Sequence, residues 1–491
     1  MSIEQPDIPA RPTLDEYARA ERLAPMVDAL RDHASEPVRA LRGRTVWMIS
    51  STAAGGGVAE TLPRVVAVLR ELGVRTEWRV IQGRNPAFFT LTKRVHNMLH
   101  GRDEGDLTEA DRELFARESA GMAEELAPHV GPDDIVVIHD PQPAAVGDRL
   151  QERLGVPTIW RCHVGLERST PSTDAAWRFL EPHLRRYGRT LFTLRDYVPD
   201  VLEDRASVLP PSIDPLSHKN RDLDLDKLTG ILRDAGLLAT EHPAITLPFG
   251  HRAERLQPDG TFGPATSPDD IGLLFRPIVL QVSRWDRLKG FAPLLEGFAR
   301  LKASSGEDRK ERHRRRVDHA RLVLAGPDPT GVQDDPEAAA VLEELCSAWR
   351  ALPEAVRRDI VLLRLPMASR KQNGLMVNAL QRCACVVVQN SLQEGFGLTV
   401  TEALWKERTV LGSQAAGIRA QIEDGRTGRL VADAEDPEQI AAALDAMLSD
   451  EAGRAAWGRN GRDTVARRFL IFAEVQGWLE VLAKTAAPAS S

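Results

Sequence analysis

The chain has few cysteines and no long apolar run. Its four cysteines, at positions 162, 346, 383 and 385, are too few for a disulfide framework and indicate a reducing compartment, the cytoplasm. Cys383 and Cys385 form one Cys-x-Cys without a second pair, which is more typical of small buried residues than of a metal site. No segment approaches the ~20 apolar residues of a membrane span, and the acidic N-terminus lacks the apolar core of a secretory signal.

Neither sign of charge is in large excess. The 64 Lys and Arg against 71 Asp and Glu give a formal net charge of −7, so the composition predicts no nucleic-acid or membrane partner. The 42% hydrophobic and 27% charged residues are typical of a folded protein. One basic run, Arg309–Arg316 (RKERHRRR), lies among acids. We interpret it as a solvated helix face or loop, with a polyanion contact as the alternative.

Short apolar, β-branched runs recur in two series. The first series is Thr45–Ser50, Thr76–Ile81, Asp134–His139, Thr158–His163 and Thr190–Leu194, and the second is Ile278–Ser283, Arg321–Gly326, Asp359–Leu365, Cys385–Asn390 and Thr409–Gly412. Such runs are typical of strands buried on both faces of a parallel sheet. Helical patterns lie between many of them, as at Ala59–Leu72, and after the last of them, as at Asp436–Leu448. The alternation predicts an α/β architecture with right-handed crossovers.

A polar segment rich in Pro, Gly and Asp separates the two series and sets the expected domain boundaries. We expect a helical extension at residues 1–41, an α/β domain at 42–213, a connection or insertion at 214–275, a second α/β domain at 276–468, and a C-terminal helix and tail at 469–491.

Three glycines, Gly55, Gly56 and Gly57, follow the first strand and open a helix. Glycine allows a ligand to approach the backbone closely, and a helix N-terminus offers free N–H groups to oxygen-rich ligands. The spacing matches neither a dinucleotide fingerprint nor a phosphate loop. The alternative is a tight strand–helix turn.

Two cations, Arg284 and Lys289, follow the first strand of the second series. The carboxyl ends of parallel strands are where α/β sheets bind ligands, and such a pair neutralises a leaving diphosphate without a metal. The alternative is surface charge balanced by Asp286.

Further along, Glu394 and Glu402 bracket a Gly-x-Gly loop and a helix start. Free backbone N–H groups there suit sugar hydroxyls or phosphate, and a carboxylate suits a vicinal diol such as that of ribose. The alternative is a generic strand–loop–helix.

The segment Glu394–Ala403 (EGFGLTVTEA) resembles the EGFGL…E signature of the retaining GT-B glycosyltransferases of family 4. Arg284 and Lys289 fall where that family keeps its diphosphate-binding Arg and Lys. The segments VIHDPQP (137–143), WRCH (160–163), LPPSIDP (209–215) and QVSRW (281–285) are similar to the trehalose synthases and the related trehalose phosphorylases. The resemblance implies a GT-B fold, with two Rossmann-like domains facing across a cleft. It also implies a C-terminal helix, here Phe472–Lys484, that crosses back to the first domain.

The resemblance implies retaining transfer of glucose from a nucleoside diphosphate glucose to glucose, giving α,α-trehalose with no tightly bound cofactor. The nucleotide, ADP, UDP or GDP, stays open. The implied catalytic residues are His163, Arg284, Lys289 and Glu394, and the implied donor-binding residues are Gly395, Phe396, Gly397, Leu398, Thr399 and Glu402. Glu402 would bind the ribose, and Glu394 the hydroxyls of the donor glucose.

In the first domain the resemblance implies acceptor binding by the three glycines and Asp140, and a catalytic role for His163. His163 would reach the transferred sugar near its 6-hydroxyl, although a lone strand-end histidine is ordinarily structural. Asp140 would bind an acceptor hydroxyl, with a strand-terminating Asp-Pro turn as the alternative. The archaeal-type pattern reads His-Ile-Asp where this chain has His163-Val164-Gly165, which leaves the acceptor open.

Other functions share these motifs. The nearest is a trehalose phosphorylase, with phosphate in place of the nucleotide diphosphate, and the next is a family 4 transferase that glucosylates another small acceptor. A nucleotide-sugar-binding regulatory protein without turnover and an isomerase on the same scaffold are alternatives from other classes. The expected partners are a sugar nucleotide and a sugar acceptor, and a homodimer is common among related proteins.

Overall fold

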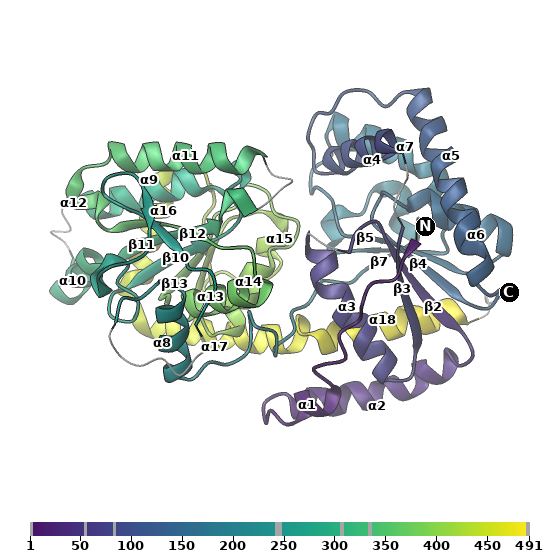
Figure 1. Cartoon of the computed structure of the whole chain (residues 1–491), viewed down its shortest axis with the longest axis horizontal. Coiled ribbons are helices and arrows are strands. Elements are labelled where there is room, and N and C mark those ends of the chain that lie inside the picture. The colour runs from purple at the N-terminus through teal and green to yellow at the C-terminus, as the bar shows by residue number, and fades with distance from the viewer. Residues whose placement is uncertain are drawn as a thin grey trace. The chain divides into compact units, whose positions relative to one another are not determined.

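We describe the chain from a computed structural model over residues 3–53, 56–81, 85–240, 248–304, 309–331 and 336–487, without the side chains of 56–60 and 336. Two compact units divide the chain, one comprising Met1–Asp214 with Arg468–Ser491 and the other Pro215–Arg467. Each unit has one sheet with helices on both faces (Figure 1). Within the described ranges, none of the helices combines the length and hydropathy that crossing a bilayer requires.

The first unit is built on a sheet with the order β1-β3-β2-β4-β5-β6-β7. Its strands are β1 (Ile3–Glu4), β2 (Thr45–Ser50), β3 (Arg75–Ile81), β4 (Ile135–His139), β5 (Thr158–Cys162), β6 (Arg189–Phe192) and β7 (Ala206–Val208). All pairs are parallel except β1 with β3. The predicted strands are therefore confirmed, whereas β1 and β7 were missed because two or three residues carry no apolar periodicity.

Helices cover both faces of this first sheet (Figure 1). They are α1 (Leu14–Ala18), α2 (Ala24–Ala40), α3 (Gly56–Glu71), α4 (Pro86–Leu99), α5 (Glu109–Leu126), α6 (Ala144–Leu154), α7 (Pro171–Leu184) and α18 (Ile471–Ala486). Local sequence fixes several starts, since Thr108 and Thr170 form capping boxes at α5 and α7. The C-terminal helix α18 belongs to this unit and packs against α2 and α3. Ser212 Oγ anchors its first turn by donating to Glu474 Oε2 at 2.6 Å.

The second unit is built on a sheet with the order β15-β14-β13-β10-β11-β12-β8-β9. Its strands are β8 (Glu254–Leu256), β9 (Phe262–Gly263), β10 (Ile278–Val282), β11 (Arg321–Pro327), β12 (Ile360–Leu365), β13 (Val386–Gln389), β14 (Val410–Gly412) and β15 (Gly428–Leu430). The hairpin β8–β9 pairs antiparallel with β12, and the other strands are parallel. The predicted connection at 214–275 thus contributes two strands to the second sheet and, from Pro215 onward, lies in the second unit.

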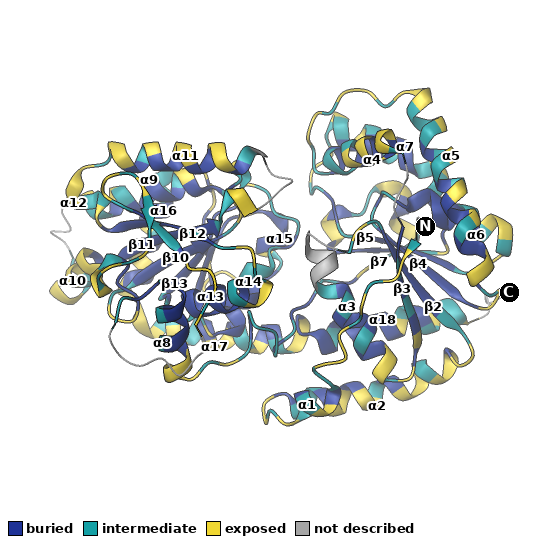
Figure 2. Ribbon diagram, viewed as in Figure 1, coloured by how far each residue is buried: buried dark blue, intermediate teal, exposed yellow. Residues whose placement is uncertain are grey.

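The core of the second unit lies between its sheet and helices. These helices are α8 (Leu225–Asp234), α9 (Phe291–Ala303), α10 (Glu311–His319), α11 (Pro336–Ala351), α12 (Glu354–Arg357), α13 (Arg370–Cys383), α14 (Leu398–Trp405), α15 (Ala416–Arg419), α16 (Pro437–Ser449) and α17 (Glu451–Arg468). The central strands of both sheets are buried, whereas the short edge strands β1, β7, β8 and β9 and the outer helix faces are partly or fully exposed (Figure 2). The basic run lies at and within α10, where Arg309 pairs with Asp445 at 2.8 Å and Arg316 with Glu451 at 2.6 Å.

Strand order marks where each sheet binds ligands. In an open parallel sheet, ligands bind outside the carboxyl ends of the strands at the point where the strand order reverses. This point lies between β2 and β4 in the first sheet and between β10 and β13 in the second. Arg284 and Lys289 follow β10, and Glu394 follows β13. The topology therefore brings the predicted residues of the second unit to one sheet edge.

Candidate functional site

In the second unit, the turns after β10 and β13 are joined by buried hydrogen bonds. The side chain of Gln281, which is fully buried in β10, donates through Nε2 to the Lys289 carbonyl at 2.7 Å and accepts from Asn390 N at 3.1 Å. Gly290 has φ 61°, and a Cβ there would lie 2.1 Å from the Asn390 carbonyl oxygen. The two turns therefore form one rigid support for the side chains that follow them.

Lys289 and Glu394 form an ion pair on this support. Lys289 Nζ lies 2.7 Å from Glu394 Oε2, and the two side chains are 13% and 14% exposed. The same oxygen accepts from Ser391 Oγ at 3.0 Å and Gln389 Nε2 at 3.2 Å. Partial burial strengthens such charge-assisted bonds relative to bonds in water. The structure thus brings two predicted catalytic residues together and fixes the carboxylate with three donors.

Arg284 lies at a more open position on the same edge. Its side chain is 62% exposed, and its Nη2 lies 3.7 Å from Asp286 Oδ2. Asp286 also caps the turn that carries Lys289, since its Oδ1 accepts from Leu288 N at 2.9 Å. Arg284 is therefore largely exposed just beyond the carboxyl end of β10.

The Gly-x-Gly loop leads into α14 with its backbone tightly fixed. Gly397 precedes the helix with φ 81°, a left-handed conformation that favours glycine. Gln421 Nε2 donates to the Phe396 carbonyl at 2.5 Å and to the Gly417 carbonyl at 2.8 Å. A Cβ on Gly417 would lie 2.5 Å from Phe396 Cα. The N–H groups of Leu398 and Thr399 begin α14, where an N-terminus favours an anion.

Glu402 is placed inside α14, as the sequence predicts. Its side chain is 8% exposed, and Lys219 Nζ lies 3.8 Å from its Oε1. One turn later, Lys406 Nζ donates to the Glu402 carbonyl at 3.0 Å and to Asn220 Oδ1 at 3.2 Å. Burial lowers the pKa of Lys406 to about 7, although the Glu402 carboxylate opposes this shift. The carboxylate of Glu402 therefore lies beside Lys219 and favours the charged form of Lys406.

In the first unit, Asp140 joins the ends of β4 and β5. Its φ of 69° is uncommon for a residue other than glycine. The residue is held by Asp140 N donating to the Arg161 carbonyl at 2.8 Å, by Trp160 Nε1 donating to the Asp140 carbonyl at 3.0 Å, and by His163 N donating to Asp140 Oδ1 at 3.0 Å. Burial raises the pKa of Asp140 to about 6, against the opposing effects of the His163 N–H and Arg161.

His163 follows β5 and contacts a second histidine. His163 Nε2 lies 3.1 Å from His139 Nδ1, and the two ring planes are nearly parallel, at 13°, with centroids 5.4 Å apart. Burial, with a smaller effect of the Arg161 charge, lowers the pKa of His139 to about 3 and that of His163 well below its usual range. Both imidazoles are therefore neutral near pH 7. The structure thus places Asp140 and His163 side by side.

The predicted glycine segment is only partly described. Gly55 lies outside the described residues, and Gly56 and Gly57 form the start of α3. At the position where the archaeal-type pattern has Asp, a Cβ on Gly165 would lie 2.5 Å from Tyr197 Cβ. The buried ring of Tyr197 therefore occupies the space that a longer side chain would need.

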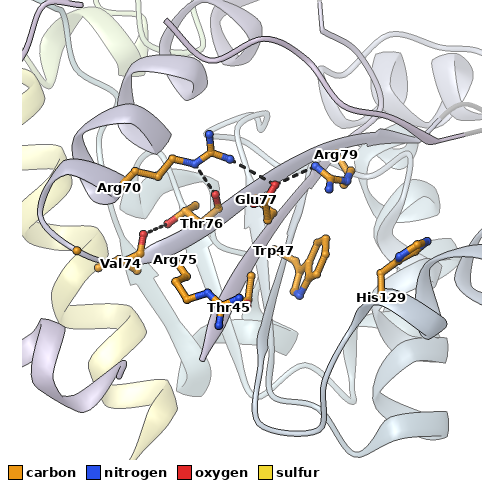
Figure 3. Close-up of a pocket in the computed structure, with 10 residues that line it drawn as sticks. Thr45, Trp47, Arg70, Val74, Arg75, Thr76, Glu77, Arg79 and His129 are labelled. Atoms are coloured by element: carbon orange, nitrogen blue, oxygen red, sulfur yellow. Dashed lines mark hydrogen bonds and ion pairs between the residues drawn. The ribbon is translucent and has the colours of Figure 1, made fainter. Parts of the chain in front are cut away.

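A separate pocket of about 470 Å³ lies at the opposite end of the first sheet (Figure 3). Thr45 and Arg75, the first residues of β2 and β3, line it. Two of its cations share one carboxylate, since Arg70 Nη2 and Arg79 Nη1 lie 3.3 and 3.0 Å from Glu77 Oε2 (Figure 3). Because parallel sheets bind ligands at their carboxyl ends, we place the functional site at the other end.

Comparison with protein families gives two matches within the chain. Residues 48–199 match the family described as "Trehalose synthase, N-terminal domain". Residues 367–464 match the family "Glycosyl transferases group 1". The first match includes Asp140 and His163, and the second includes Glu394 and Glu402.

Proteins that match most of this chain are named trehalose synthase or trehalose phosphorylase. The chain is 32% identical over 468 residues to a trehalose synthase of Thermococcus litoralis, covering 94% of this chain and 97% of that protein. It is 34% identical over 449 residues to a trehalose synthase of Rubrobacter xylanophilus, covering 90% and 91%. It is 26% identical over 431 residues to a trehalose phosphorylase of Pleurotus sajor-caju, covering 83% of this chain and 53% of that protein.

Solved structures share the fold. An α,α-trehalose 6-phosphate synthase from Burkholderia multivorans has a TM-score of 0.64 at 17% identity, covering 91% of this chain and 98% of that one. An E. coli structure with UDP-2-fluoro glucose has a TM-score of 0.62 at 16% identity, covering 90% and 99%. The predicted GT-B fold of two Rossmann-like domains is confirmed.

Proposed function

Because the chain belongs to the trehalose synthase family of GT-B glycosyltransferases, we propose that it transfers glucose from a nucleoside diphosphate glucose to free glucose and forms α,α-trehalose. The proposal assigns donor binding to the second unit and acceptor binding to the first. The observation that carries the proposal is the Lys289–Glu394 ion pair, which lies where the strand order of the second sheet reverses. The pair supports the proposal because it lies where such sheets bind ligands and offers a cation for a diphosphate and a carboxylate for sugar hydroxyls.

In the proposed reaction the glucose C1–oxygen bond to the diphosphate breaks first. Arg284, Lys289 and the N–H groups of Leu398 and Thr399 stabilise the negative charge that builds on the departing diphosphate. An oxocarbenium-like centre develops at C1, and Glu394 orients the glucose through its hydroxyls. No tightly bound cofactor is needed for this step as proposed.

The acceptor then attacks from the face that the diphosphate leaves. Its 1-hydroxyl oxygen bonds to C1, and its proton moves to the departing phosphate oxygen, so that the α configuration is retained. Asp140 Oδ1 accepts a hydrogen bond from His163 N at 3.0 Å. The other carboxylate oxygen, Oδ2, is the atom that we propose accepts a hydrogen bond from a hydroxyl of the acceptor sugar.

A donor–acceptor matrix tests the proposal. The protein would be incubated with ADP-, UDP- or GDP-glucose and with glucose, glucose 6-phosphate or other small acceptors, and the product linkage would be determined by NMR. We expect equimolar release of nucleoside diphosphate and α,α-trehalose with free glucose. A product in which the transferred glucose has the β configuration contradicts retention, and no transfer from any donor contradicts the proposal.

A second candidate function is phosphorolysis, which the likeness to trehalose phosphorylases favours. In that reaction inorganic phosphate would take the place of the nucleotide diphosphate beside Lys289. The greater identity and coverage of the synthases favour transfer from a sugar nucleotide. Glucose 1-phosphate formed from trehalose and phosphate, without any nucleotide requirement, would establish the second candidate instead.

The role proposed for Glu402 predicts a defect in donor binding. We expect Glu402→Gln to raise the KM for the nucleotide sugar by about 10-fold, with a smaller effect on kcat, because a charged hydrogen-bond acceptor for the ribose is lost. Steady-state kinetics with varied donor would measure it. Glu407→Gln is the matched control, since Glu407 is exposed and pairs with Arg462 at 3.2 Å. A donor KM for Glu402→Gln no higher than that for Glu407→Gln would contradict a contact between Glu402 and the ribose.

A further inference from the structure

His139 is a buried histidine whose two ring nitrogens both have neighbours. Nδ1 lies 3.1 Å from His163 Nε2, and Nε2 lies 3.5 Å from Met48 Sδ in β2. The Trp478 ring of α18 lies 5.9 Å from the His139 ring. Neighbours from β2, the end of β5 and α18 therefore fix the orientation of this ring.

The contacts of His139 decide which nitrogen carries the proton. A hydrogen bond between two neutral imidazoles needs one N–H donor and one unprotonated nitrogen. A thioether sulfur accepts weakly and cannot donate, so the nitrogen that faces Met48 is best protonated. His139 then carries its proton on Nε2, and its Nδ1 accepts from His163 Nε2.

The electrostatic surroundings keep both rings neutral. Arg161 is fully buried in β5 and donates through Nη2 to the Leu209 carbonyl at 2.6 Å. Its positive charge, the full burial of His139 and the partial burial of His163 disfavour imidazolium at these two residues, whose pKa values are lowered. An imidazolium, which would donate from both nitrogens, is therefore disfavoured near pH 7.

This proton arrangement leaves His163 with one accepting nitrogen. His163 Nε2 donates its hydrogen bond to His139 Nδ1, and among the described residues His163 Nδ1 makes no hydrogen bond. The side chain is only partly buried, and His163 N is held by Asp140 Oδ1 at 3.0 Å. An unprotonated Nδ1 binds a group that donates a hydrogen bond, such as a hydroxyl, and not a phosphate oxygen.

We propose that His139 is a positioning residue that fixes the tautomer of His163, so that His163 Nδ1 accepts a hydrogen bond from a sugar hydroxyl. The inference rests on the proposed function, because it assigns the sugar as the ligand of Nδ1. The chain of contacts from Met48 through His139 to His163 makes this position selective for a hydroxyl over an anionic group.

Nitrogen-15 NMR of the full-length protein with labelled histidine tests the tautomers directly. Signals are assigned by their loss in His139→Asn and His163→Asn. We expect a protonated Nε2 and an unprotonated Nδ1 in both rings of the wild-type protein at pH 7. In His139→Leu we expect the His163 signals to move toward the average of two tautomers. A proton on His163 Nδ1 in the wild-type protein would overturn the inference.

Turnover measures whether the tautomer matters to the reaction. We expect His139→Leu to lower kcat by about 10-fold or more, the equivalent of one lost hydrogen bond. His139→Asn places an amide oxygen near the position of Nδ1 and should restore most of the loss. Wild-type kcat in His139→Leu, or equal losses in both variants, would overturn the positioning role. If the protein transfers no glucose while NMR shows the expected tautomers, the proposed function fails and the proton arrangement stands.

Discussion

Replacing Lys289 by alanine is expected to lower kcat for glucosyl transfer by about 10²–10³-fold, because a positive charge is lost where the diphosphate gains negative charge. The loss also leaves the Glu394 carboxylate, 14% exposed, without its cation at 2.7 Å. Single-turnover kinetics with saturating nucleotide sugar would separate this chemical defect from a change in donor affinity. Near-normal kcat would refute the assignment of Lys289 to the leaving group.

Two further variants distinguish catalysis from stability. Arg287→Ala is the matched control, because Arg287 lies on the same turn but pairs with Glu337 and Glu344 at 2.7 and 2.5 Å. Its kcat should stay close to the wild-type value. The double variant Lys289→Ala/Glu394→Gln removes the unpaired charge, and we expect it to recover thermal stability without recovering turnover. Recovery of turnover together with stability would show that the single variant acts through folding alone.

The sequence predicts the sheets well because their strands are apolar on both faces. Runs such as Ile278–Val282 and Val386–Gln389 are bounded by polar or turn residues, so their ends are readable within one or two positions. The hairpin β8–β9 was missed because it contributes only three and two residues to the edge of the second sheet. Its pairing with β12 is a tertiary interaction that local pattern does not encode.

The sequence also predicts which residues gather at the site, but not how they are held. Lys289 and Glu394 follow strands that turn out to be neighbours, so the order of motifs suffices to place them at one edge. Gln281 and Gln389 were not singled out, although a glutamine in an apolar strand run is a visible signal of a buried polar contact. Gln421 has no such signal, because it lies outside the strands and its hydrogen bonds reach carbonyls of the Gly-x-Gly loop that are 24 and 25 residues away in the sequence.

Because the Gly-x-Gly loop is tightly fixed, we expect the substitution Gly417→Ala to cause a large loss of turnover. A Cβ at this position would lie 2.5 Å from Phe396 Cα, 2.7 Å from Phe396 N and 2.8 Å from the Glu394 carbonyl oxygen. These are backbone atoms, so the loop or α15 must move. A displacement on the order of 1 Å at the start of α14 costs about 10²-fold in turnover. We therefore expect kcat to fall by about this factor and the donor KM to rise.

The same substitution at a glycine with free space separates crowding from the loss of glycine itself. Gly250 is exposed, and a Cβ there would have no described atom within 4 Å, so Gly250→Ala should keep wild-type kinetics. Circular dichroism and thermal melting would establish that both variants are folded. Because Gln421 holds the same loop by hydrogen bonds, Gln421→Met should reproduce the kinetic defect without adding a Cβ clash. A folded Gly417→Ala protein with wild-type kcat and donor KM would show that the loop position does not limit transfer.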